Sequence, residues 1–284
     1  MDKITELKTA RSVRTVWISD VHLGFPGCSA DYLAEFLRSI RCEKLYLVGD
    51  IIDFWYMKRR RFWSQSHNNV VRSILGKAKH GTEVIFIPGN HDENLRDYDQ
   101  LILGNIHIRL DDIHEMLDGR RLLITHGDQY DYVMRHSRFL AVIGSFLYDW
   151  LLRANRLVNW ARRKMKKDYW SLAAYLKHKV KNAVQYIGQY EEILAAEAER
   201  RRVDGLICGH IHHAEISQIG DVIYMNCGDW VESCTALVER WDGTIELIHW
   251  ADKREVVKTL APQMEVETAA AREAMDDAAT GAIA

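Results

Sequence analysis

Four short apolar segments of this chain each end directly in Asp, His or Asn residues, and a fifth ends in His126. The four clusters are D-V-H at residues 20–22, G-D-I-I-D at 49–53, G-N-H-D at 89–92 and G-H-I-H at 209–212. A β-branched, buried-type strand followed at once by such residues places them where the strand leaves its sheet. The shared context therefore predicts that one edge of one sheet collects all of these side chains.

Divalent metal ions explain why these residue types gather. Two ions held by carboxylate, imidazole and amide groups can clamp the oxygens of a phosphoryl group during in-line displacement. The ligands that we assign to one ion are Asp20, His22, Asp50 and His212, and those for the other are Asp50, Asn90, His126 and His210. Asp50 is shared, because one carboxylate that touches both ions fixes their separation. The pattern is typical of a hydrolase with two metal ions.

Composition limits the other classes of protein. With 284 residues, 48% of them hydrophobic, the chain can bury a core as one domain or as one domain with an insertion. Its 38 basic and 40 acidic residues leave no overall basic field of the kind that non-specific nucleic-acid binders use. The five cysteines form no C-x-x-C pair, which favours a reducing compartment over a disulfide framework. We expect neither a signal peptide nor a spanning helix.

Strand and helix patterns alternate along the first part of the chain. Apolar strands at 15–19, 44–48 and 83–88 are separated by helical patterns at 30–40 and 62–79, which predicts an α/β layered fold. Further strands are expected at 122–125 and 205–208. From residue 214 onward, strands joined by short turns predict an antiparallel meander that joins the sheet.

The five motifs D-x-H, G-D-x-x-D, G-N-H-D, T-H-G-D and G-H-x-H, in this order, resemble those of the calcineurin-like metallophosphoesterases. The resemblance covers residues 15–230 in outline. It implies a four-layer α/β-β-α sandwich that hydrolyses phosphoesters or pyrophosphates with a water activated by metal ions. It also implies that His91 protonates the leaving oxygen or stabilises charge on the transferring phosphoryl group.

Other residues near the motifs are expected to support them. Asp92 is a candidate to orient His91 through a carboxylate–imidazole hydrogen bond, and we count both residues as catalytic. Asp53 and Asp128 are further candidates for orienting ligands. Histidines outside the motifs, such as His67, are expected to be structural.

The resemblance divides the chain into a metallophosphoesterase domain at 12–130 and 203–262, a helical lid insertion at 131–202 and a disordered tail at 263–284. The insertion begins with an apolar helical stripe at 139–151, which we expect to pack against the body of the enzyme. The basic residues and tryptophans that follow the stripe also suit an anionic membrane surface, or an acyl chain with a phosphate head.

A helical lid at this place and the SDVHLG opening are similar to the UDP-2,3-diacylglucosamine hydrolases of lipid A biosynthesis. That similarity implies cleavage of a nucleotide-sugar pyrophosphate to UMP and an acylated sugar 1-phosphate, at the inner membrane, with manganese as the first choice of metal and magnesium, zinc or iron as alternatives. Members of that group carry Arg where this chain has His91. The lid residues proposed to contact the substrate are Asp131, Arg135, Ser171, Lys177, Lys179, Lys181 and Asn182.

Two alternatives remain open at this point. The basic segment of the lid could bind nucleotides or nucleic acid, with bases stacked on Trp160 and Trp170; we rank this second, because only one local segment is basic. A non-catalytic scaffold of the same fold ranks third, because it would be expected to have lost ligand positions. The sequence predicts a cytoplasmic protein associated peripherally with the inner face of the cell membrane, and it leaves the oligomeric state open.

Overall fold

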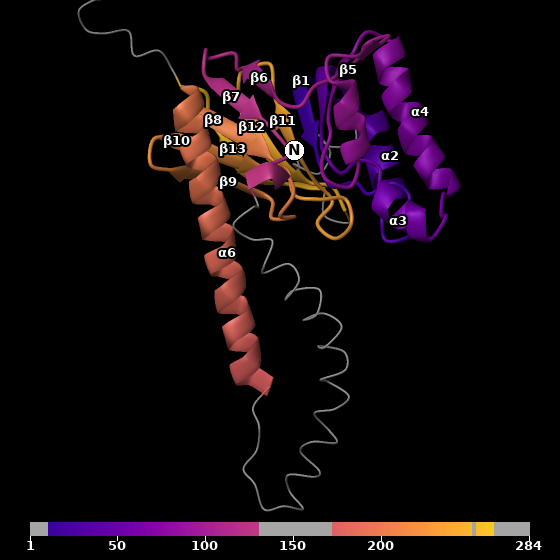
Figure 1. Cartoon of the computed structure of the whole chain (residues 1–284). Helices are drawn as coiled ribbons and strands as arrows, with labels where there is room; N and C mark the ends of the chain where they lie inside the picture. The colour runs from indigo at the N-terminus through magenta and orange to yellow at the C-terminus, as the bar shows by residue number, and fades with distance from the viewer. Residues whose placement is uncertain (1–10, 131–171, 252–253, 264–284) are drawn as a thin grey trace, which may run out of the picture.

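The computed structural model of the chain describes residues 11–130, 172–251 and 254–263. Two β-sheets pack face to face, and helices cover the outer face of each sheet (Figure 1). In Figure 1 the layers run from α6 at the left, through the two sheets, to α2 and α4 at the right. The predicted four-layer α/β-β-α arrangement is confirmed.

The larger sheet has the strand order β13-β12-β11-β1-β2-β3-β5-β4. Its strands are β1 (Arg11–Ile18), β2 (Ile40–Val48), β3 (Glu83–Ile87), β4 (Ile102–Leu103), β5 (Ile106–Ile108), β11 (Thr235–Glu239), β12 (Ile245–His249) and β13 (Glu255–Leu260). β1, β2, β3 and β5 run parallel to one another. Because parallel strands end at the same edge of a sheet, the motifs that follow β1, β2 and β3 meet there.

The smaller sheet has the order β6-β7-β8-β10-β9. Its strands are β6 (Asp112–Glu115), β7 (Arg121–Ile124), β8 (Gly205–Cys208), β9 (Glu215–Ile219) and β10 (Val222–Asn226). β7, β8 and β10 run parallel, so His126 and the G-H-I-H motif also leave from strand ends. The ligand-bearing strands thus belong to two sheets, whereas the sequence predicted one.

The expected single meander after residue 214 is wrong in part. β9 and β10 pair within the smaller sheet, whereas β11, β12 and β13 form an antiparallel meander that joins the larger sheet through β1. Both β10 and β11 are buried along their whole length. Their sequences therefore show no alternation of apolar and polar residues that would indicate which sheet each strand joins.

Three apolar layers hold the sheets and helices together. Between the sheets, Trp17 and Tyr46 stack with ring centroids 5.9 Å apart and pack with residues such as Ile207 of the smaller sheet. The outer face of the larger sheet is covered by α2 (Ala30–Ser39) and α4 (Gln65–Lys79), close to the two predicted helices. Two short elements follow strands of this sheet: α3 (Phe54–Arg59) comes between β2 and α4 in the chain, and the 3-10 helix η1 (Glu93–Tyr98) comes between β3 and β4.

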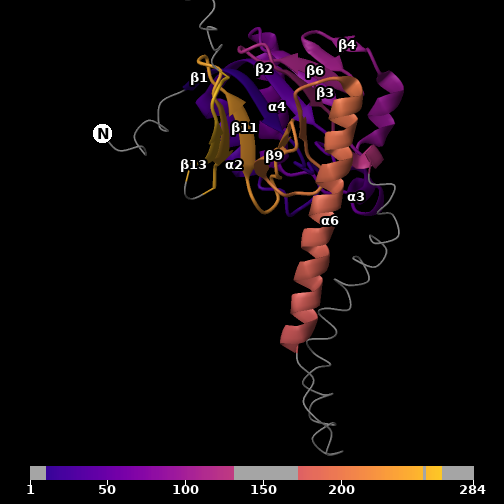
Figure 2. The same cartoon turned by 90° about the vertical axis from the view of Figure 1, so that its left-hand side faces the viewer.

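The helix α6 (Leu172–Arg201) covers the outer face of the smaller sheet. Tyr190, Leu194 and Ala198 provide that contact, and both views show the N-terminal part of the helix continuing beyond the sheets (Figures 1 and 2). The last turns of the predicted lid insertion therefore also form one layer of the sandwich. The division of the chain at residues 131 and 202 stays a prediction, and the apolar stripe at 139–151 lies outside the described residues. Among the helices that the structure describes, none has the length and apolar character needed to cross a membrane.

A buried carboxylate, Glu239, joins the two sheets, and it predicts how stability depends on pH. Glu239 is fully buried and accepts hydrogen bonds from Arg14 at 2.7 Å and Thr15 at 2.9 Å, and it pairs with His114 at 3.0 Å. Burial would raise the pKa of Glu239, but His114 and Arg14 outweigh it and hold that pKa below its usual value. The charged carboxylate therefore stabilises the fold at neutral pH, and this contribution is lost as the pH falls through the carboxyl range.

Glu239→Gln should cost about 3 kcal/mol of stability at pH 7, because it leaves Arg14 and His114 without their charged partner. Urea denaturation at pH 7 and pH 4 measures the free energy of unfolding. The difference in this free energy between the variant and the wild type should be smaller at pH 4 than at pH 7. An equal difference in the free energy of unfolding at both pH values would contradict a stabilising role of the Glu239 charge. Exposed Glu43→Gln serves as the control, and its free energy of unfolding should match that of the wild type at both pH values.

Candidate metal centre

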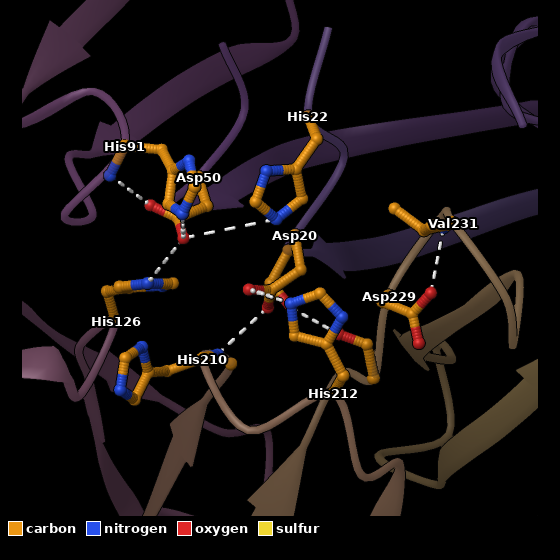
Figure 3. Close-up of polar contacts among 12 residues, drawn as sticks. Asp20, His22, Asp50, His91, His126, His210, His212, Asp229 and Val231 are labelled. Carbon is orange, nitrogen blue, oxygen red and sulfur yellow. Dashed lines mark hydrogen bonds and ion pairs between the residues drawn. The ribbon is translucent and has the colours of Figure 1, made fainter. Parts of the chain in front are cut away.

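Predicted ligands from four strand ends, together with the predicted acid His91 after β3, converge on one site (Figure 3). Asp20 and His22 follow β1, Asp50 follows β2 and Asn90 follows β3. From the smaller sheet come His126 after β7, and His210 and His212 after β8. The two sheets thus contribute to a single cluster where their parallel strands end.

Asp50 lies at the centre of the cluster. Its Oδ2 atom is 3.4 Å from Nε2 of His126 and 4.0 Å from Nε2 of both His22 and His91. Its Oδ1 atom accepts a hydrogen bond of 2.7 Å from the backbone N–H of His91. One carboxylate therefore faces imidazoles from three different strand ends.

The side chains form overlapping groups that could each hold an ion. Two of them, Asp20 with His22 and His212, and Asp50 with His126 and His210, each contain three of the four ligands that the sequence assigned to one ion. The assignment itself stays a prediction. Within each group the candidate ligand atoms lie within 4.8 Å of one another. A third group joins His22, Asp50 and His91, so the His91 imidazole also faces the site.

Buried polar atoms at the site lack hydrogen-bond partners in the described part of the chain. Both side-chain polar atoms of Asn90 are in this state, as are Nε2 of His22 and Nε2 of His126. The other ring nitrogens are held: Nδ1 of His126 is 2.9 Å from the Val48 carbonyl, and Nδ1 of His22 is 3.2 Å from Asp53 Oδ2. Since buried polar atoms are normally paired, nitrogen and oxygen atoms left facing one another fit divalent metal ions.

The carboxylates keep their charge. Burial would raise the pKa of Asp50, but the imidazoles of His126, His91 and His22 outweigh it and hold that pKa well below its usual value. The pKa of Asp20 is also lowered, since His212 and His126 outweigh its burial. Ionised carboxylates are what hard divalent ions require.

The ligand-bearing loops adopt strained backbone conformations. Asp20, His22, Asp50, His210 and His212 all have positive φ, between 51° and 72°. Each such residue costs roughly 1–2 kcal/mol relative to right-handed conformations, and residues of this kind cluster at functional sites. The loops are held in place by backbone hydrogen bonds, among them those from Val21 and His22 to the Asp50 carbonyl at 3.0 and 2.9 Å.

Asp92 does not contact the His91 imidazole, so the expected hydrogen bond between them is wrong. The buried Asp92 carboxylate instead accepts backbone N–H groups, the shortest being Gly89 at 2.6 Å and Ile51 at 2.8 Å. Burial, together with the charge of Asp50, raises the pKa of Asp92 to about 6. Asp92 therefore ties the loop after β2 to the loop after β3.

Asp53 has the role that was expected of Asp92. Its Oδ1 atom lies 2.8 Å from Nδ1 of His91 and its Oδ2 atom lies 3.2 Å from Nδ1 of His22. One carboxylate thus fixes two imidazoles with their Nε2 atoms towards Asp50. The other predicted support, Asp128, accepts a hydrogen bond of 2.7 Å from Arg96.

Two residues support the site and were missed in the sequence: Asn226, the last residue of β10, and Asp229, which follows that strand. Asn226 donates from Nδ2 to the Gly209 carbonyl at 2.8 Å, which holds the loop of His210. Asp229 accepts the backbone N–H of Val231 at 2.8 Å and shapes the neighbouring turn (Figure 3). Both come after the apolar run VIYM, so the pattern of an apolar strand followed by polar residues was also present there.

The predicted substrate residues stay predictions. Asp131, Arg135 and Ser171 lie outside the described residues. The others, Lys177, Lys179, Lys181 and Asn182, fall in the N-terminal half of α6. His213, whose role the sequence left open, is exposed beside His212.

Close packing of glycines against the ligands gives a prediction. A Cβ atom at Gly89 would lie 2.3 Å from Asp50 Oδ1 and 2.7 Å from His126 Cδ2. Gly89→Ala should therefore displace Asp50 and weaken metal affinity by about 10–100-fold, the range for misplaced ligands. Gly76→Ala, in α4 with nothing within 4 Å, is the matched control. Equal manganese affinity in both variants by calorimetry would contradict the assignment.

The chain is similar to several known proteins. Residues 13–214 match the family model described as calcineurin-like phosphoesterase. The chain is 27% identical over 231 residues to a UDP-2,3-diacylglucosamine hydrolase of Aliivibrio fischeri, covering 76% of this chain and 90% of that protein. The protein of the same name from Vibrio cholerae is 24% identical over 238 residues, which cover 80% of this chain and 94% of that protein. Among solved structures, the phosphoesterase Yfce from E. coli aligns with a TM-score of 0.46 and 16% identity, over 88% of this chain and 99% of that one.

Proposed function

The chain belongs to the calcineurin-like phosphoesterase family, and from that premise we propose that it cleaves the pyrophosphate of a nucleotide-sugar lipid resembling UDP-2,3-diacylglucosamine. The products are UMP and an acylated sugar 1-phosphate. The family makes the chain a metal-dependent phosphoester hydrolase. The substrate and its products are the proposed part, supported by the names of the similar proteins from Aliivibrio fischeri and Vibrio cholerae.

One observation carries the reaction class: Asp50 Oδ2 faces imidazole nitrogens of His22, His91 and His126 at 3.4–4.0 Å. We assign this carboxylate to both ions. Of the remaining ligands, Asp20, His22 and His212 would hold one ion, and Asn90, His126 and His210 would hold the other. Two divalent ions, when bound, supply Lewis-acid activation of water and of the phosphoryl oxygens. Manganese is our first choice, and magnesium, zinc and iron remain alternatives.

His91 is proposed to donate a proton to the leaving oxygen. Burial would lower its pKa, but the hydrogen bond to Asp53 and the charge of Asp50 outweigh it and raise the pKa above its usual value. A raised pKa favours the protonated imidazole, which is the form that a general acid requires. Asp53 holds the ring through Nδ1, which leaves Nε2 directed into the site.

Hydrolysis of the lipid substrate in ¹⁸O-labelled water tests this function. The metal-loaded protein should release UMP and the acylated sugar phosphate in equal amounts, with the label in one product only. The labelled product identifies the phosphorus that water attacks. Release of UDP, or hydrolysis of simple phosphodiesters alone, would contradict the proposed substrate.

We also propose peripheral contact with an anionic membrane at the inner face of the cell membrane. The tryptophans and basic residues of the insertion that first suggested it lie outside the described residues. Within the described part, Arg60, Arg61, Phe62 and Trp63 are consecutive and all exposed. Basic and aromatic side chains together suit an anionic lipid surface.

Sedimentation with vesicles tests this contact. The protein should sediment with vesicles that contain phosphatidylglycerol, and high salt should release it because screening weakens the attraction. Replacing Arg60 and Arg61 by Ala should reduce binding. Equal binding to neutral phosphatidylcholine vesicles would contradict an electrostatic contact.

A further inference from the structure

A cavity of about 690 Å³ opens onto the candidate metal centre. On the side of the metal centre it is lined by residues that include His91 and His212. Its outer part is lined by Phe25, Trp55, Tyr56, Lys58, Arg59 and Val231. This volume lies in the range for whole small-molecule ligands, so it is larger than a phosphoryl group needs.

Trp55, on α3, forms a fixed aromatic surface in this cavity. Its ring lies over His91, with centroids 4.6 Å apart and planes inclined by 34°, and its indole Nε1 donates to Glu93 Oε1 at 3.4 Å. The side chain is nevertheless 41% exposed. A large aromatic ring that is held at its edge and on one side, yet remains open to solvent, suits stacking of a planar group.

Two cations stand beside this ring. Lys58 and Arg59 are both exposed and line the same cavity. Neither has a carboxylate within ion-pair distance in the residues that the structure describes. Phe25 and Tyr56, which also line the cavity, pack edge to face with ring centroids 5.2 Å apart. The cavity therefore offers a planar surface and positive charge together, next to the site of phosphoryl chemistry.

We propose that this cavity binds the nucleoside monophosphate half of the substrate. The base stacks on Trp55, and Lys58 and Arg59 bind phosphate oxygens. This proposal rests on the proposed function, and it identifies which half of the substrate occupies the cavity. An acyl chain fits less well, because it carries no charge to pair with the two cations and no flat face to match the fixed ring.

Calorimetric titration of UMP into the manganese-loaded full-length protein tests the proposal. Trp55→Ala should weaken UMP binding roughly tenfold, the typical effect of one lost base stack, and Trp55→Phe should weaken it less. Replacing Lys58 and Arg59 together by Ala should also weaken it roughly tenfold, because charge-assisted hydrogen bonds are lost. Uridine, which lacks the phosphate, should respond to the first change and not to the second.

Matched controls separate the cavity from general effects. Trp241 is 50% exposed and its indole donates to Ser12 at 3.3 Å, but it lines a different cavity, so Trp241→Ala should leave UMP affinity unchanged. The adjacent pair Arg60 and Arg61 is exposed and does not line the cavity, so replacing both by Ala should have little effect.

The outcomes that overturn the proposal are distinct from failure of the proposed function. Absence of UMP binding to the wild type, or equal UMP affinity in all variants, would overturn it. A selective loss of affinity for the acylated sugar phosphate in the Trp55 variant would also overturn it and would assign the cavity to acyl chains. If the wild type bound UMP as expected but did not cleave the lipid substrate, the nucleotide site would stand and the proposed substrate would fall.

Discussion

The Asp50→Asn variant is expected to lose turnover and to bind less of both metal ions. Asp50 Oδ2 faces His126 at 3.4 Å and both His22 and His91 at 4.0 Å, so one oxygen borders both ligand groups. An amide in its place removes the negative charge that both ions share. We expect kcat/KM to fall at least about a thousandfold, which corresponds to roughly 4 kcal/mol of transition-state stabilisation.

Metal analysis of the purified variant distinguishes this role from that of an ordinary ligand. A residue that serves one ion would lower the content towards one ion per chain, whereas Asp50→Asn should lower both. Asp112→Asn is the control, because that carboxylate accepts hydrogen bonds from Tyr46 and Arg109 outside the site. Full activity of Asp50→Asn would contradict the central position of this carboxylate.

The His91→Ala variant is expected to keep its metal ions and to lose rate. The imidazole is held by Asp53 at 2.8 Å and faces Asp50, which suits a proton donor. General acids contribute about 10²–10⁴-fold to rate, and we expect kcat to fall within that range. The loss should be smaller for substrates with a good leaving group, such as bis(p-nitrophenyl) phosphate, because a leaving group of low pKa needs less help from an acid.

Metal content and the dependence on leaving group decide between two roles for His91. The structure also places His91 in a possible ligand group with His22 and Asp50. If His91→Ala emptied the site, or if all leaving groups suffered equally, His91 would be a ligand or a structural residue. His80→Ala, at the C-terminal end of α4 away from the site, is the control.

The sequence predicted the convergence of the site better than its internal contacts. Strands followed at once by Asp, His or Asn were enough to bring together Asp20, Asp50 and His91, because the parallel strands β1, β2 and β3 end at a common edge. The pattern could not show that two sheets share the task. β2 and β8 are each followed by Gly and then by Asp or His, and this pattern would be the same whichever sheet the strand joined.

The partners of individual side chains depend on geometry that spacing does not encode. Asp53 and Asp92 each lie close to His91 along the chain or in space, and only the backbone path directs Asp53 to the imidazole and Asp92 to backbone N–H groups. Trp55 is similar, since an aromatic residue after G-D-I-I-D could equally have entered the core. Its exposure and its contact with His91 come from the turn of α3.

Anomalous diffraction from crystals grown with manganese tests whether two metal ions share the Asp50 carboxylate. We expect two anomalous peaks about 3.5–4 Å apart, the usual spacing of paired catalytic ions, with the Asp50 carboxylate in contact with both. Asp20, His22 and His212 should surround one peak, and Asn90, His126 and His210 the other. A single peak, or two peaks of which only one contacts Asp50, would contradict the assignment of Asp50 to two metal ions.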